Sequence, residues 1–264
     1  MLAAPAARGG RLRRPAAGGA PPAGEERRPR TVCAVRTACS LLAAALLILS
    51  APAARADPRV GQPPLSDRAA AAKVVRSAWE PRPKNARATH RVPTAAQLRA
   101  FRRQSDNPYA RWVTGNFRGT TDEVMQWAAA KWGLSPNLVR AVGATESWWR
   151  MSTVGDNGDS VGLFQVRRPY HRRGALVCSL FRHDAALNAD YWASIVRTYY
   201  DGKQTWLNTV SGNGAPYRAR DLWGSIGAWF SGRWHDPGAE SYVAKVKDYL
   251  QRRVWRTREF AGGG

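Results

Sequence analysis

The stretch from Ser135 to Gln165 constrains the fold of this chain more than any other feature of its sequence. It opens with Ser135-Pro136, and a serine cap followed by proline in the first turn is typical of a helix start. Residues three or four positions apart lie on the same face of a helix. In a helix that runs to Trp149, four residues share one face: Val139, Val142, Glu146 and Trp149. The pattern therefore places one carboxylate on an apolar stripe.

Glu146 on that stripe has the property that a general acid needs. A carboxylate among Val and Trp side chains loses solvation, which disfavours its ionised form and raises its pKa toward neutrality. Glutamate is seldom fully buried, so the alternative is that Glu146 is the first polar residue where a buried helix reaches the surface. Spacing alone leaves both interpretations open.

The chain is predicted to reverse direction after this helix. Residues 155–159 read Gly-Asp-Asn-Gly-Asp, and these residue types favour tight turns and positive φ. The next segment is apolar around one polar residue, Gln165, and is expected to lie back near Glu146. The Gln165 amide could then hydrogen-bond a sugar or the Glu146 carboxyl. At most a small β-hairpin is expected, from Val154 to Val166.

Several short motifs in this region and near the C-terminus resemble one known family. Glu146-Ser147, the glycine-bearing turn and Gly-Leu-Phe-Gln-Val at 162–166 resemble the Glu-Ser and Gly-Leu-Met-Gln-Ile signature of the soluble lytic transglycosylase and goose-type lysozyme-like superfamily. Ala-Trp-Phe-Ser-Gly at 228–232 stands where that family often has Ala-Tyr-Asn-x-Gly. Tyr-Val-Ala-Lys-Val at 242–246 resembles the Tyr-Val-x-x-Val that follows. The resemblance extends from Thr120 to Trp255.

The resemblance implies a lysozyme-like helical fold with a cleft, and cleavage of peptidoglycan glycan strands between N-acetylmuramic acid and N-acetylglucosamine. Glu146 would protonate the leaving oxygen and then act as a base on the sugar's own C6 hydroxyl, which gives a 1,6-anhydromuramyl end. The residues expected to bind substrate are Ser147, Gln165, Trp229 and Tyr242. No cofactor and no metal are implied.

The chain departs from the family pattern at two positions. Trp229 replaces a tyrosine whose hydroxyl would face the catalytic carboxylate, and Phe230 replaces an asparagine. An indole N–H can donate a hydrogen bond but cannot accept one. The sequence leaves open which group orients Glu146.

A hydrolytic muramidase is the alternative activity, and it would need a second carboxylate. Asp156 and Asp159 are the candidates, although aspartate in such a turn is also explained by hydrogen bonds to its own backbone. A non-catalytic basic wall-binding module would need no desolvated glutamate. A cationic membrane-disrupting protein and a nucleic-acid binder are two further classes.

The charge of the chain indicates anionic partners. The net charge is +22, and only nine of the 41 Lys and Arg residues precede Asp57. A basic exported domain is attracted to wall polymers, phospholipid surfaces and nucleic acid. The Arg residues are scattered and no nucleic-acid-binding module is recognisable, so no specific nucleic-acid partner is expected. Peptidoglycan glycan strands and anionic wall polymers are the expected partners, and the sequence makes no prediction of oligomeric state.

Residues 1–56 are predicted to be a signal peptide with a low-complexity N-terminal extension. The apolar run from Thr37 to Leu49 is too short for a comfortable transmembrane helix. Ala54-Arg55-Ala56 places small residues where a signal peptidase reads, so cleavage is expected before Asp57. The protein is then exported, secreted or associated with the cell wall, and has no integral membrane domain after cleavage. An uncleaved N-terminal anchor is the alternative.

The remaining chain is predicted to contain a linker and a mainly α domain. Residues 57–92 are rich in Pro and Arg and are predicted to be mostly extended around one possible helix, Ser66–Trp79. Residues 93–264 form the predicted catalytic domain, with its core at 120–255. The other predicted helices are Thr94–Gln104, Thr120–Trp132, Asp184–Tyr200, Arg220–Phe230 and Tyr242–Trp255. Short glycine-bearing loops between helices argue against a parallel sheet.

Overall fold

The computed structural model of the protein describes residues 62–167 and 175–262, with only the backbone described for residues 175–178. This part of the chain contains 10 helices and one small antiparallel sheet of three strands, so the predicted mainly α class is confirmed. None of the described helices is both long and apolar enough to span a membrane. The predicted signal peptide, residues 1–56, lies outside the described residues.

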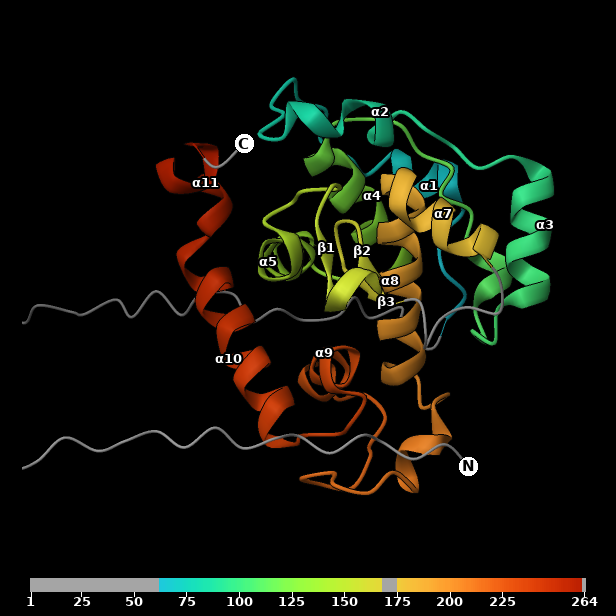
Figure 1. Cartoon of the computed structure of the whole chain (residues 1–264), viewed down its shortest axis with the longest axis vertical. Coiled ribbons are helices and arrows are strands. Elements are labelled where there is room, and N and C mark those ends of the chain that lie inside the picture. The colour runs from blue at the N-terminus through green and yellow to red at the C-terminus, as the bar shows by residue number, and fades with distance from the viewer. Residues whose placement is uncertain (1–61, 168–174, 263–264) are drawn as a thin grey trace, which may run out of the picture. The chain divides into compact units, whose positions relative to one another are not determined.

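Five helices pack in a closed circuit around the core (Figure 1). They are α4 (Thr121–Trp132), α5 (Pro136–Ser147), α8 (Ala185–Tyr200), α9 (Leu222–Ser231) and α10 (Pro237–Arg252). Helix α4 contacts α5 and α8, α8 contacts α9, α9 contacts α10, and α10 contacts α5. Every residue of α8 up to Tyr199 is buried, which makes it the central element. The circuit brings α5, α9 and α10 together although they are far apart in the sequence.

Side chains at the helix ends determine where these helices begin and stop. Thr120 and Glu123 form a capping box at the start of α4, and Gly133 ends it with a φ of 72°. Asp184 caps α8 in a similar way. These ends match the predicted ones. Helix α10 starts at Pro237 and not at the predicted Tyr242, because an aspartate cap precedes the proline and both favour a helix start there.

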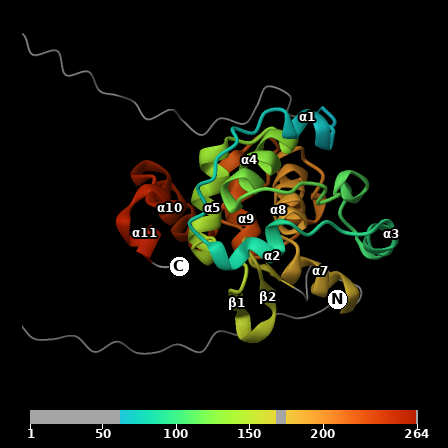
Figure 2. The ribbon, with the colours of Figure 1, turned by 90° about the horizontal axis from the view of Figure 1, so that it is seen from above.

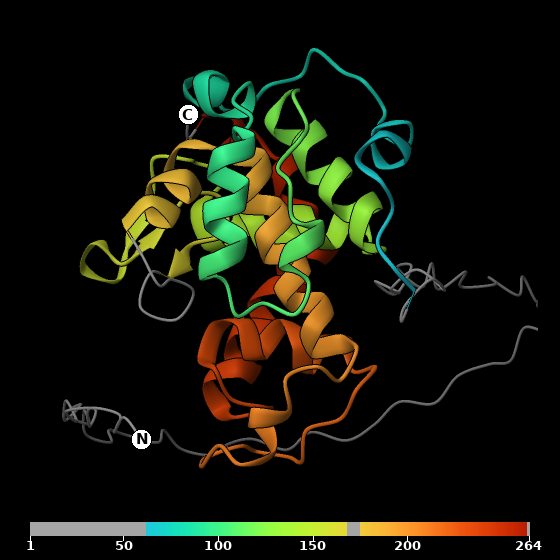
Figure 3. The ribbon, with the colours of Figure 1, turned by 90° about the vertical axis from the view of Figure 1, so that its right-hand side faces the viewer.

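The shorter helices flank the circuit. Figure 2 shows α10 and α11 (Arg258–Gly262) on one side of α4, α5 and α8, with α3 (Ala95–Gln104) and α7 (Ala175–His183) on the other. Helix α3 begins after a capping box at Thr94 and agrees with the predicted helix Thr94–Gln104, whereas α7 was not predicted. Figure 3 shows α9 and the loop before it at the C-terminal end of α8.

The small sheet follows α5 and corrects the predicted hairpin. Strands β1 (Val154–Gly155), β2 (Ser160–Val161) and β3 (Val166–Arg167) pair antiparallel in that order. Val154 pairs with Val161, which in turn pairs with Val166. The third strand forms because the chain turns a second time at 162–165, where Gly162 has a φ of 81° and Gln165 a φ of 47°.

The predicted linker is also corrected, because its described part, residues 62–92, packs against the helical domain. Its two α-helices are only α1 (Asp67–Ala71) and α2 (Ala86–Thr89), so the helix expected over Ser66–Trp79 is much shorter. The N–H of Leu65 donates to the carbonyl of Lys131, and the Lys131 ammonium lies 2.8 Å from the Asp67 carboxylate. Polar contacts with α4 therefore hold residues 62–92 against the domain, although their Pro and Arg content predicted an extended linker.

Candidate active site

Glu146 lies in the last turn of α5, where the helix stops earlier than predicted. Trp148 and Trp149 both have left-handed backbone conformations, with φ of 56° and 62°. The Trp149 indole is nevertheless buried, and its Nε1 donates to the carbonyl of Arg140 at 2.9 Å. Trp149 therefore lies in the core with Val139 and Val142, as predicted, although it follows the end of the helix. Glu146 lies next to this apolar face.

Two donors from other helices bind the same carboxylate oxygen of Glu146. The hydroxyl of Tyr242, on α10, donates to Oε1 at 2.5 Å, and Nε1 of Trp229, on α9, donates to Oε1 at 3.0 Å. Among the described residues no hydrogen bond reaches Oε2. A neutral carboxyl with one oxygen accepting two hydrogen bonds carries its proton on the other oxygen. Oε2 is therefore the atom placed to give a proton to a ligand.

Burial raises the pKa of the Glu146 carboxyl to about 7. The hydrogen bonds from Tyr242 and Trp229 oppose that rise because they stabilise the ionised form. The negative charge of Asp156 adds to the rise in pKa, and the positive charge of Lys245 opposes it. Glu146 is half-buried and so remains accessible to solvent. A pKa near neutrality suits a group that acts first as an acid and then as a base.

The geometry around Glu146 brings together three of the residues selected from the sequence. Trp229 donates where the resembled family has a tyrosine hydroxyl, and Tyr242 supplies a hydroxyl from α10. Lys245, one helical turn beyond Tyr242, was not selected from the sequence. Its spacing of three residues from Tyr242 was the signal that could have identified it, since residues at that spacing share a helix face.

Ser147 is buried and its side chain bonds only within the fold. Its hydroxyl lies 2.8 Å from the carbonyl of Leu163 and 3.3 Å from that of Gly143. The first contact ties the end of α5 to the turn between β2 and β3. That Ser147 binds substrate stays a prediction, and in this structure its hydroxyl is buried and donates to the backbone.

Gln165 closes the turn between β2 and β3 with its side chain. Its Nε2 donates to the carbonyl of Gly162 at 2.9 Å and to that of Thr153 at 3.1 Å. Of the two partners considered for the Gln165 amide, a sugar or the Glu146 carboxyl, the carboxyl is not bonded to it in this structure. Gln165 therefore shapes the loop next to Glu146, and its amide protons are already used there.

Asp156, the first candidate second carboxylate, lies in the turn between β1 and β2. Its Oδ2 accepts a hydrogen bond from the Ser160 hydroxyl at 2.5 Å and lies 3.6 Å from Nε of Arg167. The Asp156 side chain is half exposed, and its charge affects the pKa of Glu146. Asp159 follows in the same turn, and its backbone N–H donates to the carbonyl of Asp156 at 3.2 Å.

Asp184 is a second carboxyl whose pKa burial raises to about 7. It caps α8, its Oδ1 accepts from the N–H of Leu187 at 2.8 Å, and the residue is 0% exposed. A fully enclosed cap cannot reach a substrate. The exposure of the residue, and not the pKa of its carboxyl alone, therefore distinguishes partly exposed Glu146 from fully buried Asp184.

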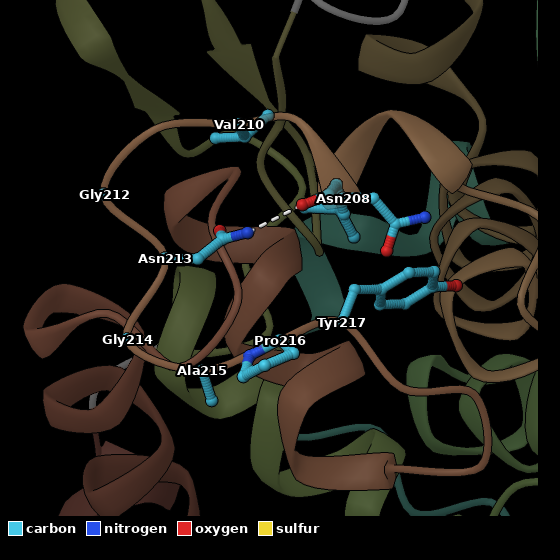
Figure 4. Close-up of a pocket in the computed structure, with 9 residues that line it drawn as sticks. Asn208, Val210, Gly212, Asn213, Gly214, Ala215, Pro216 and Tyr217 are labelled. Carbon is cyan, nitrogen blue, oxygen red and sulfur yellow. Dashed lines mark hydrogen bonds between the residues drawn. The ribbon is translucent and has the colours of Figure 1, made fainter.

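A separate pocket of about 450 Å³ lies in the loop between α8 and α9, lined by residues from Leu207 to Tyr217 (Figure 4). Asn213 Nδ2 bridges the loop to the carbonyl of Leu207 at 2.6 Å. The Tyr217 hydroxyl donates to the carbonyl of Tyr199 at 2.6 Å. None of the groups around the Glu146 carboxyl lines this pocket. Within the described residues, no cluster of His, Cys, Asp and Glu side chains could hold a metal ion.

A comparison with models of protein families finds no match, and comparisons with curated proteins and with solved structures find none either. What the protein does is therefore inferred from its sequence and from the geometry around Glu146.

Tyr242→Phe is expected to raise the pKa of Glu146 further above its ordinary value. The lost hydrogen bond stabilises the ionised carboxylate, and a bond to a charged group of about 1.5–3 kcal/mol corresponds to roughly one or two pKa units. The alkaline limb of the pH profile of kcat/KM should move to higher pH by about one unit. Tyr249→Phe on the same helix is the matched control, and an unmoved limb in Tyr242→Phe would contradict the assigned bond.

Proposed function

We propose that the protein is a lytic transglycosylase that cleaves peptidoglycan glycan strands, with Glu146 as both acid and base. The observation that carries the proposal is a partly exposed glutamate whose carboxyl has a pKa of about 7 and is held at one oxygen by two donors. The motifs that resemble the lytic transglycosylase and goose-type lysozyme-like superfamily support the choice of substrate. A lysozyme-like cleft around Glu146 and export to the cell wall belong to the same proposal.

In the first step Glu146 acts as a general acid. Its Oε2 proton passes to the glycosidic oxygen, the bond from that oxygen to C1 of the muramyl ring breaks, and positive charge develops on the ring. Trp229 and Tyr242 then stabilise the carboxylate that remains, because both donate to Oε1. These two donors position the acid and support its charged form.

In the second step the same carboxylate acts as a base. It removes the proton of the C6 hydroxyl while that oxygen bonds to C1, which forms the 1,6-anhydromuramyl product and returns the proton to Glu146. No water and no second carboxylate are needed. This fits the surroundings of Asp156, whose carboxylate is already bound to Ser160 and Arg167.

The product distinguishes this reaction from hydrolysis. Purified sacculi treated with the protein should release muropeptides whose muramyl ends are lighter by one water than ordinary reducing ends, as mass spectrometry can measure. Ordinary reducing ends would contradict the transglycosylase. Binding to sacculi without any release would instead identify a non-catalytic wall-binding module.

A hydrolytic muramidase is the second candidate, favoured by one observation. Asp156 lies close enough to Glu146 for its charge to raise the pKa of that carboxyl, and it is exposed to solvent. Under the proposed transglycosylase mechanism both Asp156→Asn and Asp159→Asn, the two candidate second carboxylates, should keep most of the turnover. Loss of turnover in Asp156→Asn, together with reducing ends in the wild type, would establish the hydrolase.

A further inference from the structure

We propose that Phe230 forms a sugar-binding subsite beside Glu146, where its exposed ring face stacks on the apolar face of a pyranose ring of the glycan strand. The inference rests on the proposed function, because it names the residue that would hold the sugar chain next to the acid.

The position of Phe230 connects it to the Glu146 carboxyl. It follows Trp229 in α9, and its ring stacks on the ring of Tyr242 with centroids 4.7 Å apart and an interplanar angle of 5°. Trp229 and Tyr242 are the two donors to Oε1 of Glu146. A ligand on the open face of Phe230 is therefore separated from the Tyr242 hydroxyl and the acid by two stacked rings, those of Phe230 and Tyr242.

Phe230 is 58% exposed, more than any other aromatic residue of the described chain. The ring of Tyr242 covers one of its faces, so the exposed area belongs to the opposite face and the edge. Removing the apolar surface of a phenyl ring from water lowers the free energy, so contact with an apolar ligand surface is favourable. The fold thus presents one open aromatic face at the rim of the site.

The surroundings of the ring fit a sugar better than a protein partner. Glu240, Ser241 and Lys245 are exposed on the neighbouring helix α10, so the ring is not part of a broad apolar patch. Ligand sites that combine an aromatic face with a few polar groups suit molecules that have both kinds of surface. A pyranose is such a molecule, since its axial C–H bonds form an apolar face that packs on an aromatic ring while its hydroxyls stay hydrated.

Binding of a soluble N-acetylglucosamine oligomer to Glu146→Gln protein, measured by calorimetry, tests the subsite. Adding Phe230→Ala should weaken binding by about tenfold, and Phe230→Trp, which keeps an aromatic face, should change it by less than about threefold. Trp206→Ala removes another exposed aromatic, 43% exposed, from a different loop and should leave binding unchanged. An equal loss in Trp206→Ala would overturn the proposal.

A second measurement separates sugar binding from support of Tyr242. In protein that retains Glu146, Phe230→Leu should raise KM for glycan more than it lowers kcat, and the pH profile should not move. A shifted pH profile would mean that Phe230 acts only through the Tyr242 hydrogen bond, which overturns the subsite.

The two proposals fail in different ways. If the wild type cleaves sacculi but Phe230→Ala does not weaken oligomer binding, the subsite is wrong and the proposed function stands. If the protein neither binds nor cleaves glycan, both fail.

Discussion

Glu146→Gln is expected to abolish measurable release of muropeptides from sacculi, with a loss of roughly 10²–10⁴-fold in turnover. The amide keeps an oxygen that accepts from Tyr242 and Trp229, so the local geometry survives. An amide nitrogen in place of Oε2 cannot transfer a proton to the leaving oxygen or take one from the C6 hydroxyl. Muropeptide release measured by chromatography gives the result directly.

The control for this substitution is Glu259→Gln, which removes an exposed carboxylate on α11 and should leave turnover unchanged. Sacculus binding by Glu146→Gln should remain close to that of the wild type. Comparable turnover by the wild type and Glu146→Gln would remove Glu146 from the mechanism.

The pH dependence of the free energy of unfolding, compared between the wild type and Glu146→Gln, tests the raised pKa of Glu146. The folded pKa of Glu146, about 7, is above the ordinary 4.5, so the folded state holds the proton more tightly than the unfolded state. Wild-type stability therefore falls as pH rises from about 4.5 to 7, by an amount on the order of 3 kcal/mol, and the Gln variant lacks this loss. Thermal unfolding should match at about pH 4 and favour the variant at about pH 8.

Asp190→Ala is expected to lower the free energy of unfolding by about 3–5 kcal/mol, because it removes one of the two carboxylates paired with a buried ammonium and leaves three further donors without their acceptor. Asp190 on α8 accepts from Nζ of Lys131 at 2.7 Å and from Nε1 of Trp132 at 2.6 Å. It also accepts from the backbone N–H groups of Thr114 and Gly115. The side chains of Asp190 and Lys131 are 0% and 2% exposed, so water cannot replace the lost bonds.

Urea unfolding followed by circular dichroism measures this loss. The matched control is Asp248→Ala, which breaks the exposed pair with Arg252 on α10 and should not change the midpoint measurably. The double variant Lys131→Met/Asp190→Leu should recover part of the stability, since it removes both charges together. A midpoint unchanged in Asp190→Ala would show that the network contributes little.

Local patterns were sufficient to predict the bounds of α4 and α8, which pack against the helices α5 and α9 that carry Glu146 and Trp229. The capping box at Thr120, the stop at Gly133 and the cap at Asp184 are all readable within a few residues of sequence, because they depend on hydrogen bonds to the nearest turn. The same applies to Glu146 on an apolar helix face. Such features do not depend on the rest of the fold.

The sequence did not predict contacts with distant residues. The helix stops at Ser147, and the hydroxyl of Ser147 bonds to the carbonyl of Leu163, which is 16 residues away. Residues 62–92 were expected to be extended, but Lys131 and other groups of the domain hold them. In both cases the partner lies outside the local sequence, so spacing carried no signal of it.

The sequence by itself determined that Glu146 ends an apolar helix face and that Trp229 and Tyr242 belong to later helices. Only the tertiary structure decided that both donors meet the same oxygen, across separations of 83 and 96 residues. That meeting depends on how α10 packs against both α5 and α9 and so closes the circuit that α4 and α8 complete. Helical spacing determines which side chains share a face, but the side chains that fill the core determine which faces meet.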